Sequence, residues 1–258
     1  MGGEVRIVRE DAIGWMVFDH LDRRNAITAE MWAAIPPAAK SLDEDAAVRV
    51  VILRGAGEEA FVAGADISEF EQLRSGEAGR RYEDENAKAF AVLQAVKKPV
   101  IAMIHGFCIG GGMALALCAD IRYAADDATF AIPAARLGLG YPPHGLEALV
   151  RVVGYAAAKE ILFTARRFDA AEGASKGLLN AVVAKAELES FVRKRAADIC
   201  SNAPLTIRAA KRVLDARARG GEDIEAALES VRACFESDDY REGVRAFLEK
   251  RKPVFRGR

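Results

Sequence analysis

Three consecutive glycines, Gly110 to Gly112, constrain the fold more than any other feature of this sequence. They follow the apolar run 100–104, which is typical of a buried strand, and they open the apolar run 112–119, which is typical of a buried helix. Glycines at a helix start let a ligand approach the backbone closely, and the first helical turn holds unpaired N–H donors at its positive end. We therefore expect this loop to stabilise an oxyanion. It matches neither GxGxxG nor the P-loop, so the glycines alone do not define a ligand. Phosphate binding and simple close packing are alternatives.

A second segment of small residues, 61–67, follows the strand-like run 50–53 and leads into a helical pattern. Small side chains here would again let backbone N–H groups point at a ligand. The alternative is a plain strand-to-helix turn that Asp66 caps.

Strand and helix patterns alternate along most of the chain, which is the rhythm of βαβ units and predicts an α/β fold. Residues 4–10 and 13–18 favour an N-terminal hairpin. Further strands are expected at 50–53, 100–104 and 121–123, with helices at 77–96, 112–119, 156–163 and 169–176. Pro36-Pro37 interrupts a helical pattern and is expected to end or kink it.

Beyond Glu187 only helical patterns occur, interrupted at 202–204 and 220–221. We expect a core over residues 1–190 and an α-helical region over 191–258, which the family resemblance described below interprets as a catalytic core and an oligomerisation region.

The charges almost cancel, because the chain has 37 basic and 38 acidic residues and a formal net charge of −1. No global field would draw the chain to nucleic acid or to a membrane surface, so an anionic ligand must be bound locally. The four cysteines form no CxxC pair, and no histidine cluster suggests a metal site. The first ten residues lack the pattern of a signal peptide, and we expect a cytoplasmic protein.

The two small-residue segments together resemble the crotonase, or enoyl-CoA hydratase/isomerase, superfamily, and the similarity runs over nearly the whole chain. The residues that carry it occur in one order along the sequence: 22–26, 63–66, 99–102, 110–112, Asp120, Phe130, 159–164 and 247–253. The resemblance implies a crotonase (ClpP/crotonase-like) spiral of ββα units followed by a C-terminal helical trimerisation region. It also implies a homotrimer or a dimer of trimers.

The resemblance further implies the roles of particular residues. The N–H groups of Ala65 and Gly111 would form an oxyanion hole for the carbonyl of an acyl-CoA thioester. Coenzyme A would be part of the substrate, with no separate cofactor and no metal. The residues expected to hold it are Arg24, Ala26, Ala63, Asp66 and Ile67, together with Phe247 and Lys250, which would reach the nucleotide bound by a neighbouring subunit.

The sequence departs from the hydratases of this family at the two positions that matter for acid–base chemistry. The glutamates that together add water across the double bond fall, by position, at Ala114 and Ala134. Neither alanine can transfer a proton. We therefore expect decarboxylase- or isomerase-type chemistry through an enolate.

The segment 137–146 contains two candidate catalytic residues, Tyr141 and His144. It is similar to the corresponding loop of the methylmalonyl-CoA decarboxylase branch of the family, in which a tyrosine faces the substrate carboxylate. That branch retains a glutamate at the position of Ala114 and has a histidine at that of Ala65. Tyr141 could instead be a packing aromatic, and His144 could instead cap the following helix.

His20 and His105 lie beside strand ends and are assigned structural roles. Asp66, Glu69 and Glu147 are carboxylates that could reach the site. Two functions stand as alternatives to decarboxylation or isomerisation. One is an enoyl-CoA hydratase with another water-activating residue, and the other is a non-catalytic acyl-CoA binding protein.

Overall fold

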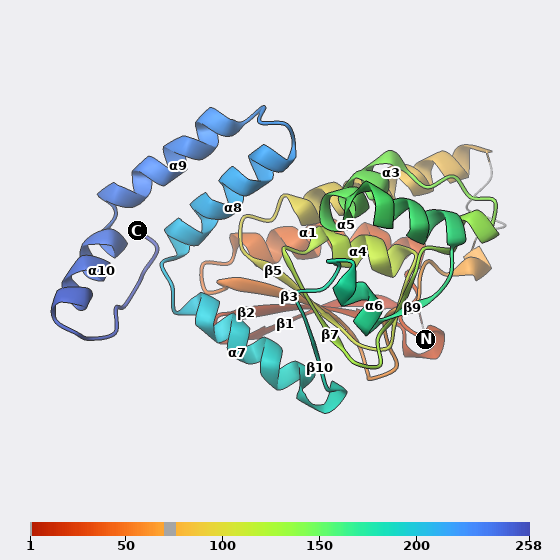
Figure 1. Cartoon of the computed structure of the whole chain (residues 1–258), viewed down its shortest axis with the longest axis horizontal. Helices are drawn as coiled ribbons and strands as arrows, with labels where there is room; N and C mark the ends of the chain where they lie inside the picture. Colours follow the sequence, from red (N-terminus) through yellow and green to blue (C-terminus); the bar gives the residue numbers. More distant parts are fainter. Residues whose placement is uncertain (1, 70–75) are drawn as a thin grey trace.

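The computed structural model describes residues 2–69 and 76–258, and within them two sheets stack against layers of helices (Figure 1). The larger sheet has six strands in the order β1-β2-β3-β5-β7-β10, and the smaller has four in the order β4-β6-β8-β9. The strands are β1 Glu4–Glu10, β2 Ile13–Asp19, β3 Val50–Gly55, β4 Ala60–Val62, β5 Val100–Ile104, β6 Phe107–Ile109, β7 Ile121–Ala125, β8 Thr129–Ala131, β9 Phe168–Asp169 and β10 Ala181–Val183.

Helices fill the connections between these strands and make up the C-terminal part of the chain. They are α1 Ala29–Glu44, α3 Gly76–Gln94, α4 Gly111–Cys118, α5 Pro143–Thr164, α6 Ala170–Ser175, α7 Leu188–Cys200, α8 Pro204–Ala218, α9 Ile224–Glu236 and α10 Asp238–Leu248. The predicted hairpin is confirmed, because β1 and β2 pair antiparallel from Glu4 opposite Asp19 to Glu10 opposite Ile13. The expected strands at 50–53, 100–104 and 121–123 are also present.

A ββα unit recurs three times and explains how the site is assembled. Strands β3, β5 and β7 pair in parallel in the large sheet, and the strand that follows each one, β4, β6 or β8, pairs in parallel in the small sheet. The carboxyl ends of β4, β6 and β8 therefore lie at one edge. The residues that follow these strands, 63–67, 110–114 and 132–134, come together there.

Apolar side chains fill both faces of the large sheet. One face packs on α1, α3, α4 and α5 around fully buried residues such as Trp32, Leu53 and Phe61. The other face packs on α7 through Leu188, Val192 and Ala196. The expected boundary at 190/191 falls inside α7, so α7 belongs with the core, and α8 to α10 are the helices that leave it (Figure 1).

Two helices differ from the expectation. Pro36-Pro37 was expected to end or kink its helix, and the first of these outcomes is wrong, because α1 continues through both prolines. Each proline removes one backbone hydrogen bond, but Ile35, Pro36 and Ala39 are buried, and their packing holds the helix together. Helix α5 begins at Pro143, well before the expected start at 156, and is interrupted at Gly154, where φ is 75°.

Candidate active site

A cavity of about 190 Å³ lies where the ββα units converge. The loop after β4 contributes Ala63, Gly64, Ala65 and Ile67, and the segment from the end of β6 into α4 contributes Ile109, Gly110, Gly111 and Ala114. The opposite walls come from α1, from α3, and from the segment between β8 and the first turn of α5. They are lined by Trp32, Glu83, Asn86, Phe90, Ile132, Pro133, Ala134, Leu137, Leu139, Gly140, Tyr141, Pro142, His144 and Gly145.

The backbone amides of Ala65 and Gly111 face the same small space. A Cβ built on Gly111 would lie 3.6 Å from the backbone nitrogen of Ala65. In the described part of the chain neither amide donates a hydrogen bond, although their neighbours do: Asp66 donates to Ile27 O at 2.9 Å, and Gly110 to Ala131 O at 2.8 Å. Two free donors therefore converge at the positive end of α4.

Close packing requires one glycine of this run. Gly112 touches β4, and a Cβ there would lie 2.2 Å from the carbonyl oxygen of Val62. Gly110 has a φ of 52° and Gly64 a φ of 120°, which favour glycine at both loops. Close packing, one of the alternatives weighed for this loop, therefore accounts for Gly112.

Ala114 and Ala134 both line the cavity and are buried, with exposed fractions of 8% and 7%. The methyl groups lie in the wall of the site, and neither position carries a proton-transferring group. Glu83 is the one carboxylate among the described lining residues, and it is exposed.

Tyr141 and His144 lie in the same cavity, on the segment that enters α5. The Tyr141 hydroxyl and His144 Nε2 are buried without a hydrogen-bond partner. Burial raises the pKa of Tyr141 above its usual range, so this hydroxyl stays protonated. The His144 ring packs on Phe90, with 5.3 Å between centroids. Pro142, not His144, is the N-cap of α5, so the capping alternative for His144 is wrong.

The expected coenzyme A residues fall into two groups. Ala63 and Ile67 line the cavity, and the segment with Arg24 and Ala26 is joined to it, because Ala63 N donates to Arg24 O at 3.0 Å and Ile27 N to Gly64 O at 2.8 Å. The Arg24 side chain lies outside the lining, with Nε 2.5 Å from Glu59 Oε1 and its guanidinium 5.1 Å from the centre of the Phe107 ring.

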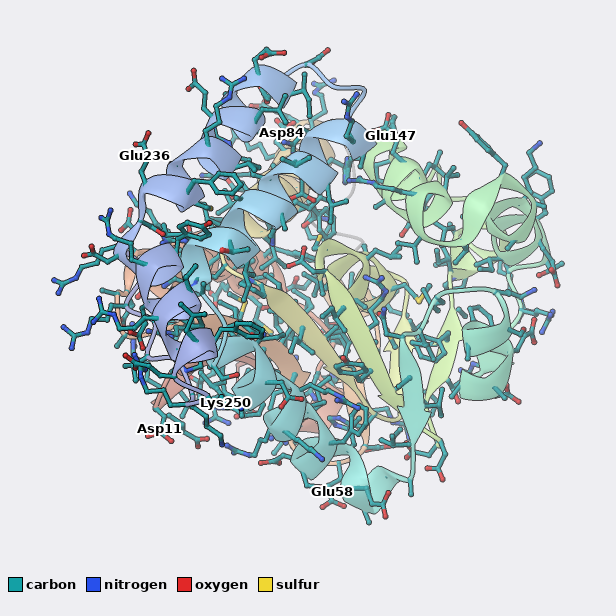
Figure 2. All side chains as sticks on the ribbon, turned by 60° about the vertical axis from the view of Figure 1, so that its left-hand side comes forward. Asp11, Glu58, Asp84, Glu147, Glu236 and Lys250 are labelled. Atoms are coloured by element: carbon teal, nitrogen blue, oxygen red, sulfur yellow. The ribbon has the colours of Figure 1, made fainter. Side chains whose placement is uncertain are left out.

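Phe247 and Lys250 are not brought to this cavity. Phe247 lies at the end of α10 and Lys250 just beyond it, far from α3 and α5 in the same chain, and Phe247 is 83% exposed. Figure 2 shows Lys250 at the lower left, beside the C-terminal helices, and Glu147 of α5 at the upper right. Their assignment to a nucleotide bound by a neighbouring subunit stays a prediction.

None of the carboxylates considered from the sequence lines the cavity. Asp66 accepts hydrogen bonds from the backbone and hydroxyl of Ser68, at 3.0 and 2.7 Å. Desolvation would raise the pKa of Asp66, but these bonds and the nearby Arg23 outweigh it and lower that pKa. Glu69 accepts from Ala29 N at 2.9 Å, at the start of α1, and Glu147 is exposed outside the cavity lining.

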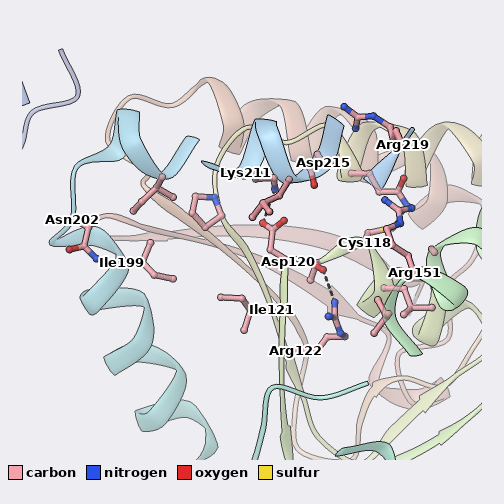
Figure 3. A pocket seen from close by; sticks show the side chains of 18 residues that line it. Cys118, Asp120, Ile121, Arg122, Arg151, Ile199, Asn202, Lys211, Asp215 and Arg219 are labelled. Atoms are coloured by element: carbon pink, nitrogen blue, oxygen red, sulfur yellow. Dashed lines mark hydrogen bonds and ion pairs between the residues drawn. The ribbon is translucent and has the colours of Figure 1, made fainter. Parts of the chain in front are cut away.

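A larger cavity, of about 510 Å³, lies between α8 and the core (Figure 3). Three of its charged side chains have local partners: Lys211 Nζ lies 2.7 Å from Asp120 Oδ2, and Arg122 donates to Ala119 O at 2.6 Å. None of the residues predicted for the active site lines it. No group of three or more potential metal ligands occurs in the described residues. Among them, no helix is long and apolar enough to cross a bilayer.

Comparison with known proteins identifies the class to which this fold and site belong. The family model for enoyl-CoA hydratase/isomerase matches residues 9–258. The chain is 38% identical over 256 residues to crotonyl-CoA hydratase from Syntrophomonas wolfei, covering 96% of this chain and 95% of that protein. It is 33% identical over 258 residues to methylmalonyl-CoA decarboxylase from Escherichia coli, covering 98% of each.

The fold agrees with the sequence comparison. An enoyl-CoA hydratase/carnithine racemase structure from Magnetospirillum magneticum superposes with a TM-score of 0.95 at 38% identity, covering 98% of this chain and 96% of that one. The chain belongs to the enoyl-CoA hydratase/isomerase family, within the crotonase superfamily. The predicted crotonase fold is confirmed.

Sequence reasoning missed two polar residues of the cavity, Glu83 and Asn86, which both lie on α3. The sequence indicates only that residues around 71–91 set the size of the pocket, and 71–75 lie outside the described residues. Helix α3 is mostly polar, so Glu83 and Asn86 look like members of a solvent-exposed face.

Proposed function

We propose that this chain binds an acyl-CoA thioester in the cavity and decarboxylates a malonyl-type acyl group through an enolate. The observation that carries the proposal is the combination of two free amides, at Ala65 and Gly111, with alanine at positions 114 and 134. Loss of CO₂ produces an enolate without removal of a proton, so the reaction needs an oxyanion hole but no general base. Isomerisation requires a base to remove a proton from carbon before the enolate can form, which decarboxylation does not.

The proposed step is balanced by groups that line the cavity. The bond between Cα and the carboxyl carbon breaks, CO₂ leaves, and the electron pair forms the enolate, whose oxygen accepts hydrogen bonds from the amides of Ala65 and Gly111. Such a donor contributes about 10²–10³-fold to a rate. His144 then delivers a proton to Cα, and solvent restores it. Tyr141 holds the carboxylate as a neutral donor, because its raised pKa keeps it protonated.

The charge of the cavity supports the same reaction. No lysine or arginine occurs among the described lining residues. A carboxylate bound there would be desolvated without a cationic partner, which destabilises the charged ground state relative to neutral CO₂. The likeness to the Escherichia coli decarboxylase points in the same direction.

Hydration is the second candidate, because the Syntrophomonas relative is a crotonyl-CoA hydratase and Glu83 lines the cavity. In that case Glu83 would be the water-activating residue. If the chain binds the thioester without turning it over, it is an acyl-CoA binding protein. In each case we expect coenzyme A to enter as part of the substrate, with the C-terminal helices assembling a homotrimer or a dimer of trimers.

A panel of acyl-CoA thioesters followed by mass spectrometry separates these functions. Release of CO₂ from methylmalonyl- or ethylmalonyl-CoA, with loss of activity in Tyr141→Phe, is the expected result. Hydration of crotonyl-CoA with kcat above roughly 1 s⁻¹ would contradict the proposal. If that rate then collapses in Glu83→Gln, the hydratase alternative replaces it. Tight binding of coenzyme A without turnover of any thioester would leave only the binding function.

A further inference from the structure

Unpartnered polar atoms are concentrated in the candidate active site. In the described residues, four buried side-chain polar atoms lack a hydrogen-bond partner, and three of them line this one cavity: Asn86 Oδ1, the Tyr141 hydroxyl and His144 Nε2. The fourth belongs to His105, which lies outside this lining. Buried polar groups in folded proteins are almost always paired. A cluster of three unpaired groups therefore indicates that a ligand supplies their partners.

The three atoms come from two elements that pack together. Glu83, Asn86 and Phe90 follow one another at helical spacing on α3, so they share one face of the helix. Phe90 contacts the His144 ring at 5.3 Å between centroids, which places Asn86 one turn away from His144. Exposure falls along this face from the exposed Glu83 through the partly buried Asn86 to the buried Phe90.

The contacts of Phe90 connect this polar wall to the amides of Ala65 and Gly111. Phe90 packs edge-on against Trp32 at 5.2 Å between centroids. A Cβ on Gly111 would lie 3.2 Å from Cζ2 of Trp32. The Trp32 and Phe90 rings thus form a continuous wall that runs from the amides to Asn86 and His144. A thioester bound at the amides would extend its acyl group along these rings toward the unpaired polar atoms.

A plain hydrocarbon chain is a poor occupant of this space. It would keep all three polar atoms from water without offering any of them a hydrogen-bond partner, which is unfavourable. Given the proposed acyl-CoA function, on which this depends, we infer that the acyl group carries an oxygen substituent of its own, a hydroxyl or a carboxylate. Asn86 is then a specificity-determining residue that binds this substituent together with Tyr141 and His144.

The size of the cavity limits the acyl group as well. Its volume of about 190 Å³ is only a little larger than that of an engineered cavity of about 150 Å³ that takes benzene. A short acyl group with one polar substituent fills this space. Four-carbon thioesters are therefore suitable probes.

The test compares dissociation constants, by calorimetry on the full chain, for butyryl-CoA and three oxygenated four-carbon analogues: 3-hydroxybutyryl-, 4-hydroxybutyryl- and succinyl-CoA. We expect at least one oxygenated thioester to bind ~10-fold more tightly than butyryl-CoA, the effect of about one well-made hydrogen bond to a buried group. Butyryl-CoA binding as tightly as all three, or more tightly, would overturn the inference.

Asn86→Leu tests the residue itself, because leucine keeps the size of the side chain but removes its polarity. The preference for the oxygenated thioester should fall to about twofold or less, while the affinity for free coenzyme A stays unchanged. Gln94→Leu is the matched control, since Gln94 is an amide on the same helix outside this cavity lining, and its preference should equal that of wild type.

A preference that survives intact in a folded Asn86→Leu variant would overturn the role given to Asn86. If neither free coenzyme A nor any thioester binds, the proposed function itself fails. That result differs from a failure of this inference alone, in which thioesters bind but the oxygenated ones gain nothing.

Discussion

Gly111 lies beside the backbone nitrogen of Ala65, which a Cβ on Gly111 would meet at van der Waals distance. A Cβ on Gly111 would approach the Ala65 nitrogen to 3.6 Å and Cζ2 of Trp32 to 3.2 Å. Gly111 is absent from the residues with positive φ, so alanine fits its backbone. Its side of the loop is therefore kept open for a reason other than conformation, which agrees with a ligand oxygen bound between two amides.

Gly111→Ala should separate activity from folding. The added methyl group occupies the space beside the two amides, so we expect kcat/KM on the preferred thioester to fall by about 10²-fold, the effect of losing one oxyanion donor. The melting temperature should stay within a few degrees, because only the edge of the Trp32 ring has to move. A folded variant with wild-type activity would show that these amides do not hold the thioester oxygen.

Gly112→Ala is the neighbouring change with the opposite expectation. Its methyl group would meet the Val62 carbonyl oxygen at 2.2 Å, and neither backbone can move away easily. Overpacking of this kind costs about 1–3 kcal/mol or more of stability. Urea denaturation should show the loss directly. Stability equal to wild type would mean that α4 and β4 are less tightly packed than the structure has them.

Tyr141→Phe should lower activity without lowering stability. The hydroxyl is buried without a partner, so removing it relieves an unpaired polar group and should leave the free energy of unfolding unchanged or raise it by about 1 kcal/mol. If Tyr141 orients the substrate carboxylate, decarboxylation should fall by about 10²-fold or more. The pair of measurements is decisive, because a packing role predicts the reverse: full activity with unchanged or reduced stability.

Much of the core could be predicted because its signals are local. Strands β3 and β5 are apolar runs with helical patterns after them, and the glycines of α4 mark both a helix start and a site. Strands β4, β6 and β8 could not be predicted by the same means, because three residues are too few to show a period of two. They are nevertheless the strands that bring residues 63–67, 110–114 and 132–134 to one edge.

The parts of the site that could not be predicted depend on tertiary packing. Asn86 and Glu83 belong to a polar helix, and only the packing of Phe90 on Trp32 and His144 shows that their face turns toward the cavity. The persistence of α1 through Pro36 has a similar cause, since burial of Ile35 and Ala39 outweighs the lost backbone bonds. Ala114 and Ala134 could be located from sequence, because recognisable residues flank both positions.

Lys250→Gln tests whether the C-terminal end of one chain reaches the ligand of another. Lys250 has a φ of 54° and lies away from the cavity of its own chain, beside the exposed Phe247. If its ammonium binds the nucleotide phosphates in an oligomer, the variant should bind acyl-CoA about tenfold more weakly and acyl-pantetheine equally well. Equal losses for both ligands would contradict a nucleotide contact.

Sedimentation should show that Phe247→Glu, which places a charge on this surface, favours the monomer.

His105 should make the stability of the chain sensitive to mild acid. His105 follows β5 in the chain, just before β6, and its side chain is buried. Desolvation, with smaller contributions from Arg54 and Lys185, lowers its pKa to about 4, while Asp127 and Glu58 oppose the shift. Below pH 6.5 the unfolded chain therefore binds a proton on this histidine that the folded chain does not bind. The contribution of His105 to the free energy of unfolding is complete above pH 6.5 and is lost as the pH drops toward 4. By pH 5 the loss from this one group should reach about 2 kcal/mol.

His105→Gln removes the titration, so its free energy of unfolding should gain about that much relative to wild type between pH 7 and pH 5. Parallel stability curves for the two proteins across this range would show that His105 does not stay neutral in the folded state.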